Sequence, residues 1–314
     1  MGMETKFNRD QDVIMVAGPT ASGKTALAID IAHIVDGVII NGDSMQIYDD
    51  LFIVTACPSK EEQSEAPHHL YNCLDGAKAC SVGKWMGLVR DEVEKARQKG
   101  KVPILCGGTA LYLNAAQHGI SAIPDIPEAL HLQVMAEHRS LGGEAMLAHL
   151  KIIDPEIGER LSAGDSQRIT RAIEVFRHTN RPLSAWQNDP PQGQLSGNFV
   201  NISILPERAC LYERINQRFA LMWDKGAVEE VEQLLARDLA PTLPVMKAVG
   251  VPQIAGYLKG DLDKQTAIED AQRESRRYAK RQFTFFRNNF ITNFEIDETY
   301  SARKKFEFFS KILL

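Results

Sequence analysis

The stretch GPTASGKT, residues 18–25, follows the apolar run VIMVA (13–17) and precedes ALAIDIAHIV (26–35), whose spacing predicts a helix. It matches the pattern G-x-x-x-x-G-K-[ST], a loop between a buried strand and a helix that cradles phosphate groups. Backbone N–H groups at the start of the helix face the anion, the lysine adds a positive charge, and the final hydroxyl is a ligand for Mg²⁺. The sequence therefore predicts a polyphosphate site, with a glycine-rich turn that binds nothing as the alternative. The residues expected at the site are Gly18, Pro19, Thr20, Ala21, Ser22, Gly23, Lys24 and Thr25, with Thr25 next to the metal.

Strand and helix patterns alternate through the first third of the chain. The apolar runs GVIIN (37–41) and VPILC (102–106) are separated by helical spacing, an order that is typical of βαβ units around a parallel sheet. We therefore expect an α/β fold with a phosphate-loop parallel sheet as its core. Because ligands bind beyond the carboxyl ends of parallel strands, the loops GDSMQIY (42–48) and GGTALY (107–112) are expected beside the phosphate loop.

A second region interrupts this alternation. Residues 128–150 and 165–178 have helical spacing with no strand pattern between them, and FVNISILP (199–206) resembles a returning strand. The expected organisation is a discontinuous core, 1–119 and 199–314, with a helical insertion domain at 120–198.

The composition excludes several classes of protein. The chain has 314 residues, 44% of them hydrophobic and 25% charged, and a net charge of −5, so RNA binding would need a local basic face. Its five cysteines lack C-x-x-C spacing, which argues against a zinc site or a disulfide framework and suits a reducing compartment. No apolar run is long enough to span a bilayer, and the first ten residues lack the apolar centre of a signal peptide. We expect a cytoplasmic protein without membrane association.

Asp43 is the main candidate for chemistry outside the phosphate loop. It lies past the strand expected at 37–41, and three roles are open to it: metal ligand, general base, or cap of the next turn. The amide, hydroxyl and phenol groups that follow it suit binding of a nucleobase, with an ordinary polar loop as the alternative. The strand in which a triphosphatase would place an acid for Mg²⁺ ends instead at Cys106 and two glycines.

Two basic segments are candidates for contact with RNA. Gln167, Arg168 and Arg171 share one face of the helix expected at 165–178, and the segment 272–288 has six Lys or Arg residues against one Glu, interleaved with aromatic residues. Such patterns suit the binding of RNA phosphates. Solvated helix faces are the alternative for both segments.

Taken together, these segments resemble the tRNA dimethylallyltransferases, also called tRNA isopentenyltransferases. The resemblance extends from Val13 to Arg287, and the lack of the zinc-finger tail of eukaryotic members favours the bacterial type. It implies transfer of the dimethylallyl group of dimethylallyl diphosphate to N6 of the adenine on the 3′ side of the tRNA anticodon, with release of diphosphate and assistance by Mg²⁺. The segments that carry it, in the order of the family, are GPTASGKTALA, GDSMQIY, APHHLYN, VPILCGGTALYL, RITRAIEVF, RINQRF and RRYAKRQFTFFR.

The resemblance also implies roles for individual residues. Asp43 would be the general base, Lys24 and Arg218 would neutralise the departing diphosphate, Thr109 would line the channel where the amine meets the prenyl carbon, and Thr25 would bind Mg²⁺. The partners implied are tRNA and dimethylallyl diphosphate, and the chain is expected to be a monomer. The residues implied to bind tRNA are Asp43, Ser44, Met45 and Gln46 around the adenine, and Gln167, Arg168, Ile169, Thr170 and Arg171 on the anticodon stem-loop.

Three departures from the family pattern and two other functions remain to be weighed. Cys57 stands where the family usually has a lysine, Ala110 where glycine is common, and VGVPQ (249–253) replaces a VGYRQ-like run. The alternative function is that of a small-molecule or nucleotide kinase, with Arg168 and Arg171 as lid arginines. A nucleotide-switched RNA-binding protein without catalysis is the third hypothesis, and binding of ATP by the loop stays open.

Overall fold

The structure is a computed structural model of the 314-residue chain and describes Asn8 and residues 11–297. The segments 1–7, 9–10 and 298–314 lie outside the described residues, and with them most of the start on which the expectation of no signal peptide rests. The chain divides into two compact units, one formed by Met1–Gln117 and Leu195–Leu314 and the other by His118–Gln194. The second unit thus begins at residue 118 rather than 120 and ends at 194 rather than 198. Its end is earlier because the backbone N–H of Leu195 already donates to the carbonyl of Ala116 in the first unit.

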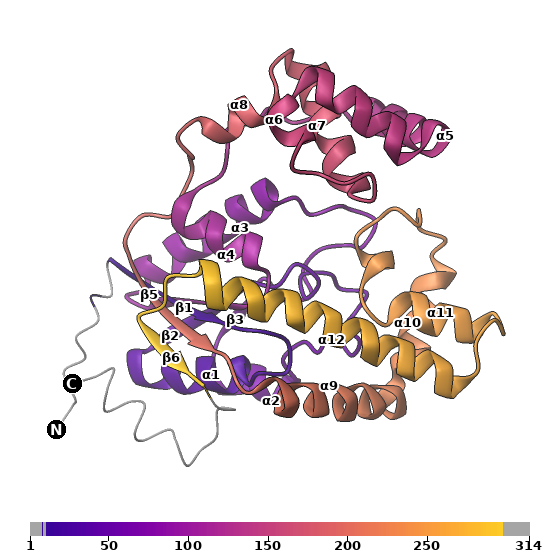
Figure 1. Ribbon diagram of the computed structural model, residues 1–314. Coiled ribbons are helices and arrows are strands. Elements are labelled where there is room, and N and C mark those ends of the chain that lie inside the picture. Colours follow the sequence, from indigo (N-terminus) through magenta and orange to yellow (C-terminus); the bar gives the residue numbers. More distant parts are fainter. Residues whose placement is uncertain (1–7, 9–10, 298–314) are drawn as a thin grey trace. The chain divides into compact units, whose positions relative to one another are not determined.

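A parallel sheet forms the centre of the first unit (Figure 1). Its six strands have the order β3-β2-β4-β1-β5-β6, and every neighbouring pair is parallel. All six positions of β1 are buried, as a strand covered on both faces requires, which explains its unbroken apolar run. The sheet confirms the predicted α/β class. The strands are β1 (Asp12–Ala17), β2 (Gly37–Asn41), β3 (His68–His69), β4 (Val102–Gly107), β5 (Asn198–Ile204) and β6 (Phe294–Ile296).

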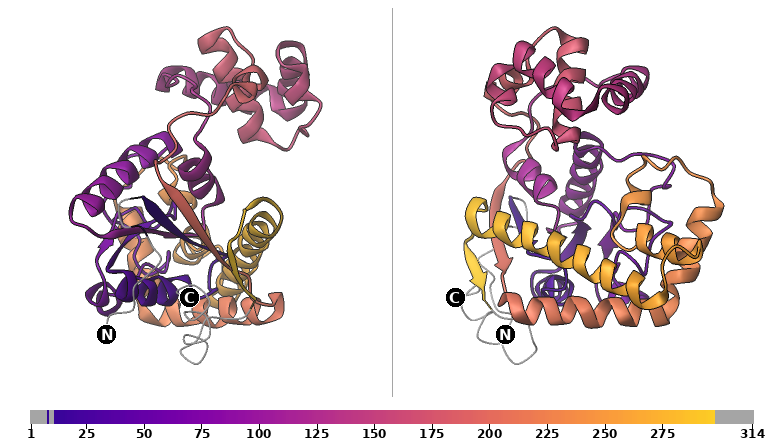
Figure 2. Two further views of the ribbon diagram at one scale, coloured as in Figure 1. Left: turned by 90° about the vertical axis from the view of Figure 1, so that its left-hand side faces the viewer. Right: turned by 45° about the vertical axis from the view of Figure 1, so that its right-hand side comes forward.

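Helices of the first unit cover this sheet and extend beyond it. Helix α12 lies against α9 (Figure 2), where Gln272 of α12 donates to the backbone carbonyl of Asn216. The segment η1 is a π-helical turn that contains a break at Gly226, where φ is 103°. The helical segments are α1 (Lys24–Val35), α2 (Lys60–Glu65), α3 (Val82–Gln98), α4 (Ala110–His118), α9 (Arg208–Met222), η1 (Trp223–Ala227), α10 (Val228–Ala236), η2 (Val245–Lys247), α11 (Val251–Leu258) and α12 (Lys264–Asn289).

The second unit is helical and has a core of its own. Its helices are α5 (Glu128–Ile153), α6 (Pro155–Gly158), α7 (Ser166–Thr179) and α8 (Leu183–Asn188), so the helices expected at 128–150 and 165–178 are α5 and α7. Val134 and Leu150 of α5 pack with Ile169 and Ile173 of α7 in this core. An antiparallel bridge between Ile120 and Gln192 joins the two ends of the unit.

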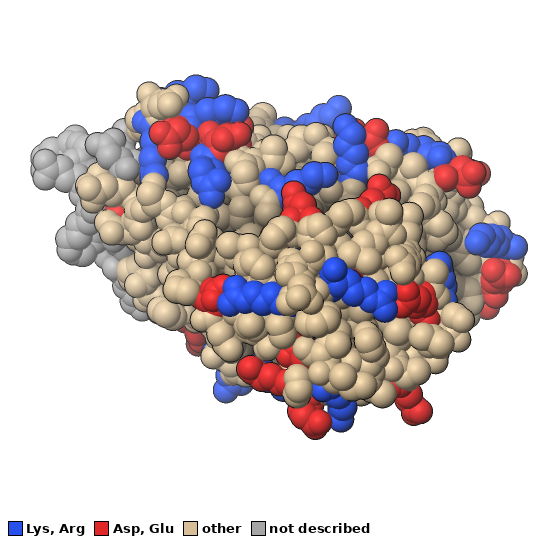
Figure 3. All heavy atoms as spheres, turned by 90° about the horizontal axis from the view of Figure 1, so that it is seen from above, with Lys and Arg blue, Asp and Glu red and all other residues tan. Residues whose placement is uncertain are grey.

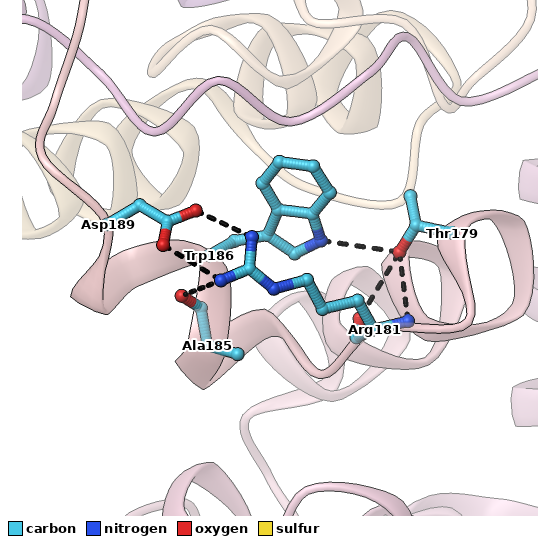
Figure 4. A network of polar contacts seen from close by, with 5 residues as sticks. All are labelled: Thr179, Arg181, Ala185, Trp186 and Asp189. Atoms are coloured by element: carbon cyan, nitrogen blue, oxygen red, sulfur yellow. Dashed lines mark hydrogen bonds and ion pairs between the residues drawn. The ribbon is translucent and has the colours of Figure 1, made fainter.

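One arginine fixes the turn between α7 and α8 (Figure 4). The Arg181 guanidinium makes two hydrogen bonds to the Asp189 carboxylate and one to the Ala185 carbonyl, and its Cζ lies 4.7 Å from the centre of the Trp186 ring. The indole N–H of Trp186 in turn donates to the Thr179 hydroxyl at 3.3 Å. Because Arg181 is paired in this way, it is a structural residue of the turn.

Every helix among the described residues is too short or too polar to cross a lipid bilayer.

Candidate active site

The phosphate loop turns between β1 and α1 in a conformation that requires glycine at two positions. At Gly18, φ is 154°, and a Cβ there would lie 2.5 Å from the backbone oxygen of Ile204 on the adjacent strand. Gly23, with φ of 100°, caps the first turn of α1. The hydroxyl of Ser22 is buried and has no hydrogen-bond partner among the described residues. A buried, unpartnered donor at a helix N-terminus fits a bound anion.

Two partly buried cations accompany this loop. The Nζ of Lys24 donates to the Pro19 carbonyl at 2.7 Å, and the Arg218 guanidinium donates to the Thr20 hydroxyl. Burial lowers the pKa of Lys24 to about 8, and burial together with nearby Arg214 lowers the pKa of Arg218 to about 10. Both groups therefore carry their charge at neutral pH in surroundings where water screens it weakly, which favours a polyanionic ligand.

Asp43 occupies a tight turn just after β2. Its Oδ1 accepts from the backbone N–H of Met45 at 2.9 Å, and its own N–H donates to Asn41 Oδ1 at 2.7 Å. Its carboxylate acts on both Lys24 and Arg218, because its negative charge opposes the burial that lowers their pKa values. The Met45 bond agrees with the capping alternative. The attraction adds that the carboxylate lies near enough to both cations to act on their charge.

Thr109 lies beside Asp43 because the loops after β2 and β4 touch. A Cβ on Gly107 would lie 2.1 Å from the backbone carbon of Gly42, so only glycine permits this approach. The Thr109 hydroxyl accepts from the N–H of Ser44 at 2.9 Å and donates to the Ser44 hydroxyl at 3.2 Å. The expected meeting of these loops is confirmed.

Gln282 of α12 joins the phosphate loop to the loop that carries Thr109. Its Oε1 accepts from the N–H of Thr20 at 2.9 Å, and its Nε2 donates to the Gly108 carbonyl at 2.8 Å. The side chain is only 4% exposed. No local sequence pattern marks this bridge, because its partners are 262 and 174 residues away.

The loop expected to receive the adenine is only partly exposed. Ser44, Met45 and Gln46 are each half-buried, and the Gln46 amide donates to the carbonyls of Thr55 and Ala56. The carboxamide of Gln46 is therefore already held by its own loop.

The residues expected to grip the stem-loop divide into two kinds. Ile169 is fully buried, and Thr170 is buried with its hydroxyl bonded inside α7, so neither side chain is exposed for contact with RNA. This corrects the expectation for these two side chains. They lie on the buried face of the amphipathic helix α7, whereas the exposed side chains lie on its other face. Gln167, Arg168 and Arg171 are exposed.

Surface charge is mixed rather than uniformly basic. Figure 3 shows one face of the molecule, on which Lys and Arg side chains are interspersed with Asp and Glu. On α12, Arg273 pairs with Asp270 and Arg277 with Glu274, whereas Lys280 is exposed. The basic helix is thus partly neutralised within its own sequence.

No ready-made metal cage lies in the described part of the chain, where no group of three or more His, Cys, Asp or Glu side chains converges. Thr25, the second residue of α1, is partly buried next to the loop. A single hydroxyl ligand from Thr25 fits a Mg²⁺ ion that takes most of its ligands from phosphate oxygens and water.

Comparison with known proteins shows the family of this chain. The model of one protein family, described as IPP transferase, matches residues 46–289. The chain belongs to the IPP transferase family. The match begins after the phosphate loop, so the loop adds a separate observation to it.

Curated relatives of this IPP transferase extend over most of its length. A tRNA dimethylallyltransferase from Hyphomonas neptunium is 44% identical over 88% of both chains. Another, from Novosphingobium aromaticivorans, is 48% identical over 81% of this chain and 89% of its own. The chain is therefore a transferase.

Solved structures have the same fold as this IPP transferase. The tRNA isopentenylpyrophosphate transferase of Bacillus halodurans is 32% identical with a TM-score of 0.68, and covers 96% of this chain and 95% of its own. A eukaryotic dimethylallyltransferase acting on tRNA is 26% identical with a TM-score of 0.74, over 88% of this chain and 70% of its own.

Cys57 is the departure from the family pattern that the structure explains best. Its thiol is buried, lies 3.3 Å from the Thr55 hydroxyl and donates to the backbone carbonyl of Gln46. Burial raises the pKa of Cys57 to about 12. A neutral, buried thiol makes no charged contact with an anion, so in this IPP transferase position 57 supports the loop.

Proposed function

We propose that this chain transfers the dimethylallyl group from dimethylallyl diphosphate to N6 of the adenine on the 3′ side of a tRNA anticodon. The observation that carries the proposal is the placement of two partly buried cations, Lys24 and Arg218, against the phosphate loop, with the Asp43 carboxylate near enough to act on both. Thr109 lies next to Asp43 through Ser44. A diphosphate leaving group and an amine that must lose a proton need these two kinds of group side by side.

The reaction breaks the bond between the allylic carbon and the diphosphate oxygen and forms a bond from that carbon to adenine N6. Lys24, Arg218 and the N–H groups of the phosphate loop stabilise the negative charge that grows on the diphosphate. Mg²⁺, held by Thr25 and phosphate oxygens, would neutralise part of the same charge. Asp43 accepts the proton that the N6 amine loses, and diphosphate leaves.

The target adenine is stacked inside its loop and has to be flipped out, which costs a few kcal/mol. Ser44, Met45 and Gln46 would receive the flipped base. The exposed side chains of α7, Gln167, Arg168 and Arg171, would contact the anticodon stem-loop. The basic side of α12 is a separate candidate for contact with RNA phosphates. A monomer in the cytoplasm stays a prediction from the sequence.

A kinase is less well supported. Strand β4 ends at Cys106 and Gly107, so the strand next to β1 has no acid at its carboxyl end for a nucleotide-bound Mg²⁺. Membership in the IPP transferase family also favours prenyl transfer over phosphoryl transfer.

One assay tests the proposed function. The full chain is incubated with Mg²⁺, unmodified tRNA and dimethylallyl diphosphate labelled in the prenyl group, and label in the RNA is measured. Label at the adenine after the anticodon supports the proposal. Absence of label in the RNA contradicts it, and phosphate transfer from ATP to a small molecule would support the kinase.

The pH dependence should show the lowered pKa of Lys24. With tRNA saturating, kcat/KM for dimethylallyl diphosphate should fall as pH rises through about 8, because Lys24 loses its proton there. The fall should approach tenfold per pH unit. A Lys24→Arg variant, whose guanidinium does not titrate in this range, should lack the fall. A flat profile for the wild-type chain up to pH 9.5 would contradict the proposed role of the Lys24 ammonium in binding the diphosphate.

The basic face of α12 should contribute to the salt dependence of tRNA binding. Replacing Arg277 and Lys280 together by alanine should reduce the slope of log Kd against log salt by about 1.5, since each lost phosphate contact is worth about 0.7 to 0.9. The matched control replaces Lys60 and Lys99, two exposed lysines outside α12. An unchanged slope in the α12 variant would make this helix face a solvated surface only.

A further inference from the structure

Helix α10 holds the loop that follows Gln46 through a single carboxylate. Glu230 accepts hydrogen bonds from three successive backbone N–H groups, those of Phe52, Ile53 and Val54, at 2.7, 2.7 and 2.8 Å. Successive N–H groups that converge in this way form an anion-binding nest. Bonds of this kind, with a charged acceptor, are about twice as strong as neutral ones.

Arg237, at the other end of α10, is a second anchor for the same region. Its guanidinium pairs with the carboxylates of Asp50 and Asp75. Asp50 in turn accepts from the N–H of Gly76 at 2.8 Å. The ion pair with Asp75 is partly exposed and contributes little for that reason, whereas the Asp50 carboxylate is mostly buried.

The anchored loop closes on itself and ends in a strained residue. The N–H of Ala56 donates to the carbonyl of Ile53, and that of Cys57 to the carbonyl of Phe52. Ala56 has φ of 53°, a left-handed conformation that costs a non-glycine residue about 1 kcal/mol. The surrounding bonds have to maintain this conformation, and those of Glu230 lie within the same turn.

The strained turn fixes the orientation of Gln46. The carbonyls of Thr55 and Ala56 accept from Gln46 Nε2 at 3.0 and 2.8 Å. Both carbonyl oxygens are acceptors, so they can bond only to the nitrogen of the Gln46 side-chain amide and not to its oxygen, which carries no hydrogen. The Oε1 of Gln46 consequently points to the opposite side as a hydrogen-bond acceptor, and both hydrogens of its amide are already in use.

We propose that Glu230 is a positioning residue for tRNA recognition, which acts by holding the turn that presents Gln46 Oε1 to an N–H donor of a nucleobase. The inference rests on the proposed function, because it takes the Gln46 loop to be the nucleobase-binding loop. It assigns a role in tRNA binding to a residue that contacts neither substrate. The diphosphate site, whose cations come from α1 and α9, is independent of it.

The test compares steady-state kinetics of wild type and Glu230→Gln with tRNA and dimethylallyl diphosphate varied in turn. We expect KM for tRNA to rise about 10-fold, as loss of charge from three hydrogen bonds implies, and KM for the diphosphate to stay unchanged. Glu232→Gln, an exposed carboxylate on the same helix, is the matched control and should behave as wild type. Glu230→Asp, which keeps the charge but is one methylene shorter, should show a smaller defect and serves if Glu230→Gln does not fold.

A double-mutant cycle with Gln46→Ala separates positioning from a general loss of structure. If Glu230 acts through Gln46, Glu230→Gln should add little to the tRNA KM of the Gln46→Ala enzyme. Amide hydrogen exchange at residues 52–54 should accelerate in Glu230→Gln while exchange in β1 and β4 stays unchanged. Independent, multiplying effects, or an unchanged tRNA KM, would overturn the inference alone. Failure of the wild-type chain to transfer the prenyl group would overturn the proposed function, and the inference with it.

Discussion

An Asp43→Asn enzyme should bind tRNA normally and transfer the prenyl group about 10²- to 10⁴-fold more slowly, the range that a positioned general base contributes. Asparagine is nearly isosteric, and its Oδ1 keeps the acceptor for the N–H of Met45, so the turn after β2 should persist. Its neutral amide accepts a proton very poorly. The measurement is single-turnover transfer together with tRNA Kd on the same preparation.

The control for this prediction is Asp49→Asn, an exposed carboxylate six residues further along. It should leave both quantities unchanged. Near-normal transfer by Asp43→Asn would contradict the role of Asp43 as general base. Loss of tRNA binding would instead indicate that Asp43 is a recognition residue. A raised requirement for Mg²⁺ as the main defect would make it a metal ligand.

Replacing Lys24 by alanine should lower kcat/KM for dimethylallyl diphosphate by about 10²-fold or more. The ammonium is partly buried beside the loop, where a charge-assisted contact to the leaving group is weakly screened and therefore strong. The tRNA Kd, measured without the diphosphate, should change little. Single-turnover rates at saturating and limiting diphosphate separate lost binding from slower chemistry.

The exposed Lys60 provides the comparison for this variant, since Lys60→Ala removes the same charge from the surface and should have no effect. Wild-type kinetics in the Lys24→Ala enzyme would take the phosphate loop out of the mechanism.

Local patterns predicted the parts of the molecule that local physics determines. The runs at 13–17, 37–41 and 102–106 are strands of the parallel sheet because strands covered on both faces are continuously apolar. The phosphate loop was predictable because the backbone geometry that requires its glycines lies within eight consecutive residues. Strand β3, only two residues long, is too short for any period to reveal.

The supports of the site were not predictable, because their partners are distant in the sequence. Gln282 reads as a packing residue of an amphipathic helix, and Glu230 reads as one of several surface acids in VEEVEQLLA. Gln282 and Glu230 are distinguished by hydrogen bonds to backbone atoms that lie 174 to 262 residues away in the sequence. No sequence pattern indicates such partners. Ile169 and Thr170 were assigned to tRNA contact because a family motif does not separate core positions from contact positions.

The thiol of Cys106 has a chemical consequence for an enzyme that handles an allylic electrophile. It stands near Lys24 and Asp43, and burial raises its pKa to about 11 even though Lys24 lowers it. At neutral pH only about one such thiol in ten thousand is a thiolate, the nucleophilic form. A protonated thiol buried in the core is a weak nucleophile, so in the proposed reaction Cys106 should not compete with the adenine amine for the prenyl carbon.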